Sequence, residues 1–217
     1  MGGSIGAWLI RAGHDVVLVD TDAAHAAAIR ENGLRITGPV DEFTVEAYCT
    51  DPLRLDPGFK TVLLCVKAHH TSVALNVIGQ LLHEDGFVVS VQNGLNERGI
   101  AGAVGPERTV GCFVNFGADV LEPGVIMRGN RGAVVVGELD GVRTDRISAV
   151  HALFQDFDPD AVLTENIWGY LWGKCGYGAL LFATALTPAS MSDAMEPAAT
   201  RCVYARLGAE VMQLAAA

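Results

Sequence analysis

Apolar and polar positions along the first part of the chain follow two different periods, which predict helices and strands in alternation. Residues 4–12 suit a short helix that Gly13 can end. Residues 16–19 form a continuous apolar run of the kind that buried parallel strands carry. A second helix is predicted over residues 23–31, with Thr21 or Asp22 as its N-cap.

The alternation of strands and helices continues to about residue 157. Strands are predicted over residues 34–36, 43–47, 61–66, 87–91, 110–114, 125–127 and 133–137, and helices over residues 71–82, 96–104 and 144–157. Alternating strands and helices predict a parallel sheet with helices on both faces. The fold class is therefore α/β, with a doubly wound parallel sheet.

A different pattern begins near residue 163. Residues 165–185 carry aromatic side chains without a turn signal, and residues 193–217 are again helix-like. We expect an α/β domain over residues 1–163 and the beginning of an all-helical domain over residues 164–217. The apolar face of residues 203–216 would pack on the rest of its own domain or on a second subunit, which leaves a homodimer open.

Composition narrows the choice of partner and compartment. Among 217 residues, 25 Asp and Glu face 15 Lys and Arg, giving a net charge of −10 that repels nucleic acid and anionic lipid. No apolar stretch approaches the roughly 20 residues of a bilayer span. Five widely spaced cysteines indicate reduced thiols without metal-finger spacing, and no signal segment precedes the first helix. We therefore expect a cytoplasmic protein that binds neither nucleic acid nor membranes.

Glycines at the start of the chain suggest a nucleotide site. Gly2, Gly3 and Gly6 lie directly before or within the first helix, and Asp20 ends the next strand. A dinucleotide site needs glycines where a strand turns into a helix, and an acid to accept ribose hydroxyls. The strand before the glycines is missing, so we expect Met1 to be internal to a Gly-x-Gly-x-Met-Gly turn in a longer natural chain. An ordinary N-terminal turn is the alternative.

Further motifs follow in order along the chain. They are Val66-Lys67-Ala68 and Val91-Gln92-Asn93-Gly94 at two strand ends, and Trp172-Gly173-Lys174 on the first long helix of the second domain. Together with Gly2-Gly3 and the strand pair that begins at residues 33–38, this set resembles the ketopantoate reductase (2-dehydropantoate 2-reductase) family. The likeness covers nearly the whole chain, which is then truncated at both ends.

This resemblance implies a Rossmann-like domain joined to a helical domain, with the active site in the cleft between them. It implies an NADPH-dependent oxidoreductase that converts 2-dehydropantoate to pantoate on the route to pantothenate and coenzyme A. Together with the glycine turn, the resemblance implies that the cofactor is bound by Gly2, Gly3, Asp20, Lys67 and Asn93. The substrate would be bound by Lys67, Asn93, Lys174 and Gly178, and the catalytic residues would be Lys174 and Asn93. No metal is expected.

The chemistry of a ketone reduction suits these residue types. Hydride delivery to a ketone leaves developing alkoxide charge, which a positioned cation or proton donor must meet. Lys174 can do both, and Trp172 and Tyr177 would supply an apolar wall that lowers the pKa of its ammonium group. Asn93 can donate to a substrate oxygen and accept from a ribose hydroxyl.

Three departures from the family pattern bear on substrate and cofactor. Where the family places asparagines four and eight residues after its lysine, this chain has Gly178 and Phe182. The chain also ends before the region in which the family supplies a serine and a glutamate. At Asp20, a carboxylate favours NADH over NADPH because it repels a 2′-phosphate, unless Arg30 or Arg35 folds back to bind it.

Other functions and other interpretations of single residues stay open. A related 2-keto or hydroxy acid dehydrogenase and a truncated nucleotide-binding protein without turnover are the alternatives. Several candidates also have ordinary structural interpretations: Lys67 as a strand end reaching solvent, Asn93-Gly94 as a turn, Lys174 as a surface lysine, His69-His70 as a helix start and not a metal site, and Cys175 as a packing residue and not a nucleophile.

Overall fold

Two structural units make up the chain, and the change between them falls at the start of a long helix. A computed structural model describes residues 1–217. The first unit comprises Met1–Gln92 and Asn96–Ile167, and the second comprises Asn93–Leu95 and Trp168–Ala217. The turn Asn93–Leu95, expected in the first domain, thus groups with the second unit.

The first unit begins with helix α1 (Gly2–Arg11), strand β1 (Val17–Val19) and helix α2 (Ala23–Asn32). All three lie within two residues of their predicted bounds. The carboxylate of Asp22 caps α2 by accepting from the amides of Ala24 and His25, as one of the two predicted caps. Gly33, with φ at 78°, ends the same helix.

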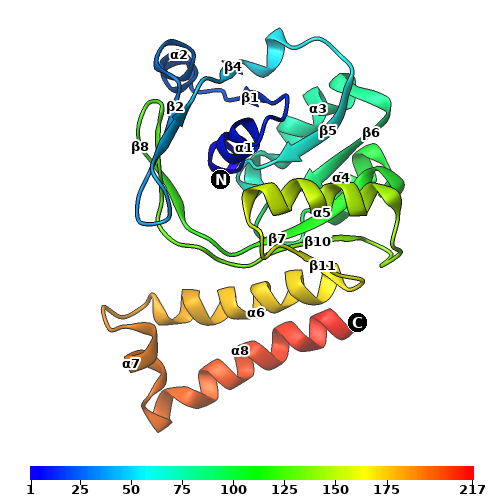
Figure 1. The fold of residues 1–217 in the computed structure, drawn as a ribbon. Helices are drawn as coiled ribbons and strands as arrows, with labels where there is room; N and C mark the ends of the chain where they lie inside the picture. Colours follow the sequence, from blue (N-terminus) through cyan, green and yellow to red (C-terminus); the bar gives the residue numbers. More distant parts are fainter. The chain divides into compact units, whose positions relative to one another are not determined.

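Strands of the first unit form three sheets (Figure 1). The two-stranded sheet pairs β1 in parallel with β4 (Tyr48–Thr50). The five-stranded sheet has the order β11-β10-β7-β6-β5 and consists of β5 (Phe59–Leu64), β6 (Leu82–Ser90), β7 (Thr109–Val114), β10 (Val134–Glu138) and β11 (Val162–Leu163). The four-stranded sheet has the order β3-β2-β9-β8 and consists of β2 (Leu34–Thr37), β3 (Phe43–Val45), β8 (Ala118–Glu122) and β9 (Val125–Arg128).

The α/β class with a Rossmann-like sheet is confirmed, with one difference in pairing. Strands β5, β6 and β7 are parallel, but β10 runs antiparallel to β7. No strand of the chain pairs with both β1 and β5, and this division lies where the missing first strand was expected. The short strands β4, β8 and β11 were not predicted. Four of the five residues of β8 are exposed, so the strand lacks the alternation that would have indicated it.

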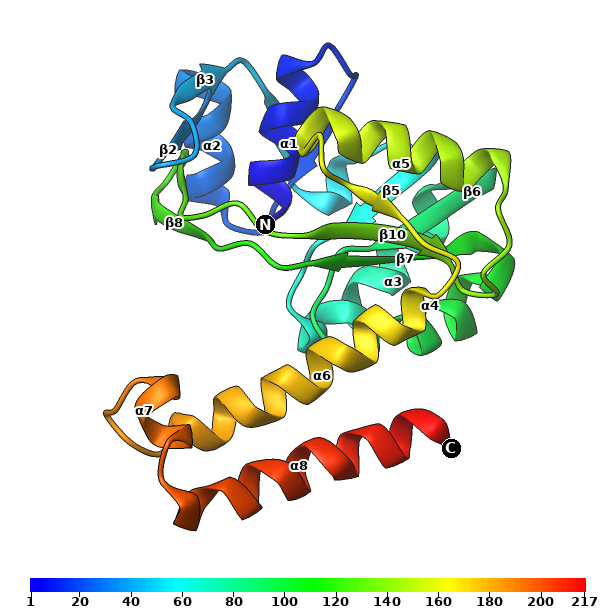
Figure 2. The same ribbon diagram turned by 60° about the horizontal axis from the view of Figure 1, so that its bottom comes forward.

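Helices cover both faces of the five-stranded sheet (Figure 2). Helix α5 (Asp145–Phe157) lies on one face, and α3 (Thr71–Leu81) and α4 (Glu97–Val104) lie on the other. All of β10 and most of β7 are therefore buried, which explains their continuous apolar runs. Three short 3₁₀ helices, Pro52–Arg54, Ala68–His70 and Pro106–Arg108, complete the connections.

A buried ion pair connects the four-stranded sheet to α5. Arg128, the last residue of β9, is 1% exposed, and its guanidinium donates to the carboxylate of Asp158 over 3.2 Å. The same guanidinium lies 4.1 Å from the ring of Phe157, 4.6 Å from that of Trp8 and 5.2 Å from that of Phe116. Burial lowers the pKa of Arg128, and Asp158 opposes this shift.

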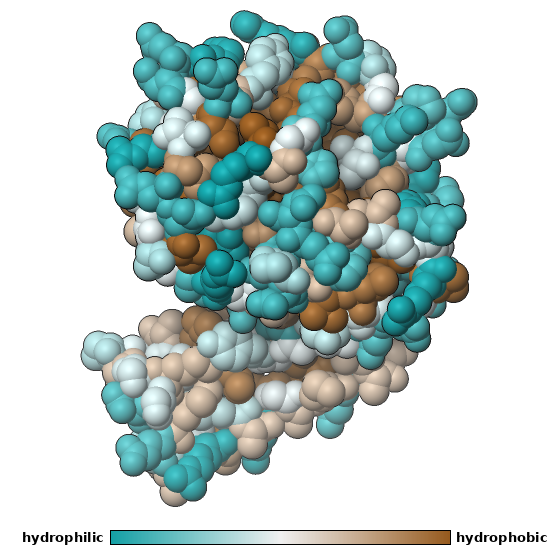
Figure 3. Space-filling view, in the orientation of Figure 1, coloured by the Kyte–Doolittle hydropathy of each residue, from teal (hydrophilic) through white to brown (hydrophobic).

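Besides the turn Asn93–Leu95, the second unit contains helix α6 (Ile167–Thr184) from its second residue onward, and helices α7 (Met191–Met195) and α8 (Ala198–Ala216). Many of its apolar side chains are exposed, including Tyr177, Leu181, Phe182, Leu186, Val203, Met212 and Leu214. Figure 3 shows apolar and intermediate residues over this unit. None of the helices in the structure combines the length and apolar character that crossing a membrane requires.

Removing one partner of the buried pair should strongly destabilise the first unit. Asp158→Ala leaves the guanidinium of Arg128 buried without its carboxylate, and we expect a loss of about 3–5 kcal/mol in the free energy of unfolding. Glu42→Ala is the matched control, because Glu42 pairs with Arg35 at 2.7 Å on the surface, where a pair contributes about 0–1 kcal/mol. Urea unfolding measures the free energy of unfolding of both variants. Equal decreases in the two variants would contradict a stabilising role for the buried pair.

Candidate functional site

The first turn of α1 lies among three segments that carry predicted site residues. Burial lowers the pKa of the Met1 amine; the charges of Cys65, Asp119 and Asp20 oppose this shift, and that of Lys67 adds to it. The beginning of α1 therefore lies near the ends of β1 and β5. The amides of a helix N-terminus provide a positive pole that suits a phosphate group.

Two predicted glycines let α1 pack closely on its neighbours. A Cβ on Gly2 would lie 3.1 Å from the Cβ of Cys65, and a Cβ on Gly3 would lie 2.5 Å from Cδ1 of Ile126. The first contact is tight and the second requires the end of the Ile126 side chain to move. Both glycines thus permit the close helix packing that the predicted nucleotide turn needs.

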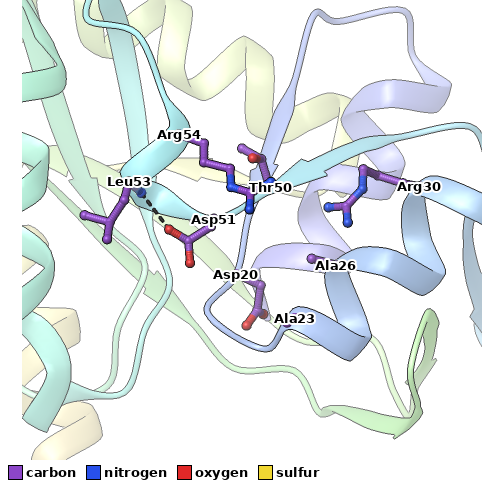
Figure 4. Close-up of a pocket in the computed structure, with 8 residues that line it drawn as sticks. All are labelled: Asp20, Ala23, Ala26, Arg30, Thr50, Asp51, Leu53 and Arg54. Atoms are coloured by element: carbon purple, nitrogen blue, oxygen red, sulfur yellow. Dashed lines mark hydrogen bonds between the residues drawn. The ribbon is translucent and has the colours of Figure 1, made fainter.

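Asp20 lies at the edge of a cavity of about 360 Å³ (Figure 4). Its backbone amide donates to the Thr50 carbonyl over 3.1 Å, and its carboxylate accepts from the Asp22 amide over 2.9 Å. The cavity lies beside the ends of β1 and β4 and is lined by Asp20, Ala23, Ala26, Arg30, Thr50, Asp51, Leu53 and Arg54. Its volume and its hydrogen-bonding groups suit a sugar or a base.

The cations expected to fold back toward a 2′-phosphate already have partners. Arg30 lines the cavity but donates to the Cys49 carbonyl over 2.6 Å. Arg35 pairs with Glu42 over 2.7 Å. Arg54 also lines the cavity, opposite Asp20 in Figure 4, and was not predicted, because the strand β4 that places it was itself missed.

Lys67 begins the turn that follows β5. It is exposed and precedes the short 3₁₀ helix Ala68–His70, and its carbonyl accepts from the His70 amide over 2.8 Å. The rings of His69 and His70 lie 4.1 Å apart at an angle of 63°, at the start of α3 as expected. Lys67 therefore lies at the carboxyl end of a parallel strand, where open α/β sheets bind ligands.

Three predicted residues belong to the second unit. Asn93 is exposed in the turn after β6, and Lys174 and Gly178 are half-buried one helical turn apart on α6. A Cβ built on Gly178 meets no atom within 4 Å, so the space beside this glycine is open. Asn93 and Lys174 thus share a structural unit, whereas Gly2, Gly3, Asp20 and Lys67 belong to the other.

Sequence reasoning missed two buried polar side chains beside the Asn93 turn. Gln92 is 5% exposed and Glu97 is fully buried as the first residue of α4. Burial raises the pKa of Glu97, which its backbone hydrogen bond and the Ser90 hydroxyl partly oppose. A polar residue within a motif does not by itself reveal that it is buried, so no signal identified either one beforehand.

The cysteines carry no disulfide, as expected for reduced thiols. Cys49 and Cys112 are buried and Cys175 is half-buried, but Cys202 is exposed on α8. Burial raises the pKa of the Cys65 thiol to about 11, and the Met1 amine opposes this shift. Cys65 is therefore almost entirely protonated at neutral pH and unsuited to nucleophilic chemistry.

Comparison with known proteins gives consistent matches over most of the chain. The family profile described as "Ketopantoate reductase PanE/ApbA" matches residues 1–141. A 2-dehydropantoate 2-reductase of Pyrococcus horikoshii is 31% identical over 177 residues, covering 80% of this chain and 56% of that protein. A Mesorhizobium japonicum protein of the same name is 28% identical, covering 94% of this chain and 69% of its own length. The chain thus spans little more than half the length of the first of these relatives.

Solved structures agree on the fold. A 2-dehydropantoate 2-reductase from Geobacter metallireducens has a TM-score of 0.84 at 27% identity, over 97% of this chain and 70% of its own. A D-mandelate dehydrogenase in complex with NADH has a TM-score of 0.86 at 21% identity, over 100% of this chain and 70% of its own. The second likeness is one of fold alone.

Thiol alkylation should separate the cysteines by accessibility and pKa. With iodoacetamide at pH 8, we expect exposed Cys202 to react first and Cys65 to react much more slowly, because only about one in a thousand Cys65 thiols is ionised three pH units below its pKa. Peptide mass spectrometry measures each rate, and Cys202→Ser should remove the fast phase. Labelling of Cys65 as fast as Cys202 would contradict the assignment.

Proposed function

The chain belongs to the ketopantoate reductase PanE/ApbA family, and on that premise we propose that it reduces a small branched 2-keto acid with a nicotinamide cofactor. The substrate we infer is 2-dehydropantoate, after the names of the relatives. The observation that carries the proposal is the placement of Asp20, Lys67 and Asn93, each within three residues of the carboxyl end of a strand, together with a glycine-led helix start. Carboxyl ends of strands are where folds of this class bind ligands.

The first unit has the groups that a dinucleotide requires. The N-terminus of α1, with Gly2 and Gly3, would hold the pyrophosphate, and Asp20 would accept the ribose hydroxyls at the edge of its cavity. Lys67 and Asn93 would bind near the nicotinamide and the substrate. When bound, the cofactor supplies the hydride.

Lys174 is the proposed general acid. A ketone that gains hydride becomes an alkoxide, and an ammonium group can donate the proton that this oxygen needs. Asn93, in the same structural unit, offers an amide that donates to the same oxygen. The remaining negative charge of the substrate is its carboxylate, which Lys67 would bind.

We infer NADH to be the preferred cofactor, although the family resemblance implies NADPH. Asp20 presents a carboxylate where a 2′-phosphate would have to lie, and like charges repel there. Of the two candidates for binding that phosphate, Arg30 donates a hydrogen bond to the Cys49 carbonyl, and Arg35 forms an ion pair with Glu42. Arg54, in the same cavity, is the group that would favour NADPH.

Substrate identity is the finer part of the proposal. The open space at Gly178 and the 80% exposed ring of Phe182 replace amides that would hydrogen-bond a hydroxylated keto acid. These features favour a related 2-keto acid as the second candidate. Five free thiols support a reducing compartment such as the cytoplasm.

Steady-state kinetics with a panel of 2-keto acids tests the proposed reaction. We expect turnover of 2-dehydropantoate or a close relative, and a loss of about 10²–10⁴-fold in kcat for Lys174→Ala, the usual range for an acid–base group. Lys60→Ala is the control, because Lys60 is an exposed lysine on β5 and should not affect kcat. Near-normal turnover of the Lys174 variant would assign that lysine to the surface, and a wholly inactive wild-type protein would favour a nucleotide-binding role.

Cofactor selectivity tests the role of Asp20. We expect a higher kcat/KM with NADH than with NADPH, and Asp20→Asn should lower this ratio by about 10–100-fold, because a charged hydrogen bond contributes about 1.5–3 kcal/mol. Asp22→Asn is the control: it removes a neighbouring charge but retains a residue able to cap α2. A strong NADPH preference in the wild-type protein would defeat the argument.

A further inference from the structure

The side chain of Gln92 continues the pairing of β5 and β6 beyond the last backbone hydrogen bond. That ladder ends where the Val91 amide donates to the Leu64 carbonyl over 2.9 Å. One residue later, Nε2 of Gln92 donates to the Val66 carbonyl over 2.8 Å and to the Thr71 hydroxyl over 2.8 Å. The two strands therefore stay connected after their backbones separate.

Both hydrogen bonds of Gln92 go to the ends of one turn. Val66 directly precedes Lys67, and Thr71 is the first residue of α3, so the two acceptors bracket residues 67–70. His70, the N-cap of α3, provides no side-chain hydrogen bond at this end of the turn. The Gln92 amide thus holds the segment that carries Lys67 at both of its ends.

The orientation of this amide is fixed by its partners. A backbone carbonyl only accepts hydrogen bonds, so the NH₂ group, and not the oxygen, must face Val66. Gln92 is 5% exposed, and its Oε1 has no hydrogen-bond partner in the structure. Because the side chain is buried, it acts on the site through the turn it holds and not by touching a ligand.

We propose that Gln92 is a positioning residue, which fixes the Lys67 turn relative to the end of β6 while the next residue, Asn93, enters the substrate site. The kinetic consequence of this inference rests on the proposed function. The two-ended clamp on residues 66–71 is a structural feature that does not depend on the proposed function. A displacement of about 1 Å at a reacting group can cost on the order of 10²-fold in rate.

Kinetics of three variants test the clamp. Gln92→Leu removes both hydrogen bonds, and we expect kcat/KM to fall by about 10–100-fold. Thr71→Val removes one acceptor and should lower kcat/KM by a smaller factor. Thr71→Ser keeps the hydroxyl, and its kcat/KM should stay within about twofold of the wild-type value. Thr109→Val is the matched control: this fully buried threonine donates to the Gly105 carbonyl over 2.8 Å, away from the turn.

A double-mutant cycle with Lys67 separates positioning from general loss of structure. If Gln92 acts through Lys67, then Gln92→Leu should lower kcat/KM much less in a Lys67→Met background than in the wild-type protein. The same factor in both backgrounds would overturn the proposal. An unchanged kcat/KM for Lys67→Met alone would instead remove Lys67 from the site and so contradict the proposed function.

Hydrogen exchange provides a readout that needs no turnover. The His70 amide donates to the Lys67 carbonyl inside the turn, so its exchange reports whether the turn stays closed. We expect faster exchange over residues 68–71 in Gln92→Leu and Thr71→Val, and wild-type exchange there in Thr109→Val. Unchanged exchange in the first two variants would overturn the clamp even in a protein without measurable activity.

Discussion

The buried charge of Arg128 is the constraint on which the arrangement of the first unit depends. A guanidinium removed from water needs a carboxylate and polarisable surroundings, and Asp158 with the rings of Trp8, Phe116 and Phe157 supplies both. These partners come from α1, the end of α5 and the segment after β7. One side chain at the end of β9 therefore contacts α1 through Trp8, and α1 carries the glycine-led start of the proposed nucleotide site.

Parallel strand pairing determines which residues lie close together at the ends of the strands. The carboxyl ends of β5 and β6 lie side by side because the two strands are parallel and pair without interruption from Thr61 with Phe87 to Leu64 with Ser90. Lys67 and Gln92 follow those ends, and the Gln92 amide donates to the Val66 carbonyl and the Thr71 hydroxyl, one on either side of Lys67. Asp20 follows β1, in a separate sheet, yet its charge acts on the same α1 start that Lys67 influences.

Much of the fold could be predicted from the sequence because burial imposes regular patterns. Continuous apolar runs indicated β7 and β10, and the Asp22 cap and Gly33 marked the ends of α2. The antiparallel direction of β10 could not be predicted, since a fully buried strand reads the same in either direction. The clamp of Gln92 and the burial of Glu97 depend on tertiary contacts that no local sequence pattern indicates. Arg54 was not predicted as a cavity residue because strand β4, which precedes it, was not predicted.

The division between the two-stranded and the five-stranded sheet also affects the behaviour of the protein in solution. Strands β1 and β5 each have one edge without a ladder partner, and such edges are templates for pairing with other molecules. Lys60 places a charge on the β5 edge strand, and the net charge of −10 keeps copies apart. Added salt screens that repulsion, so association of copies at these edges should increase with ionic strength.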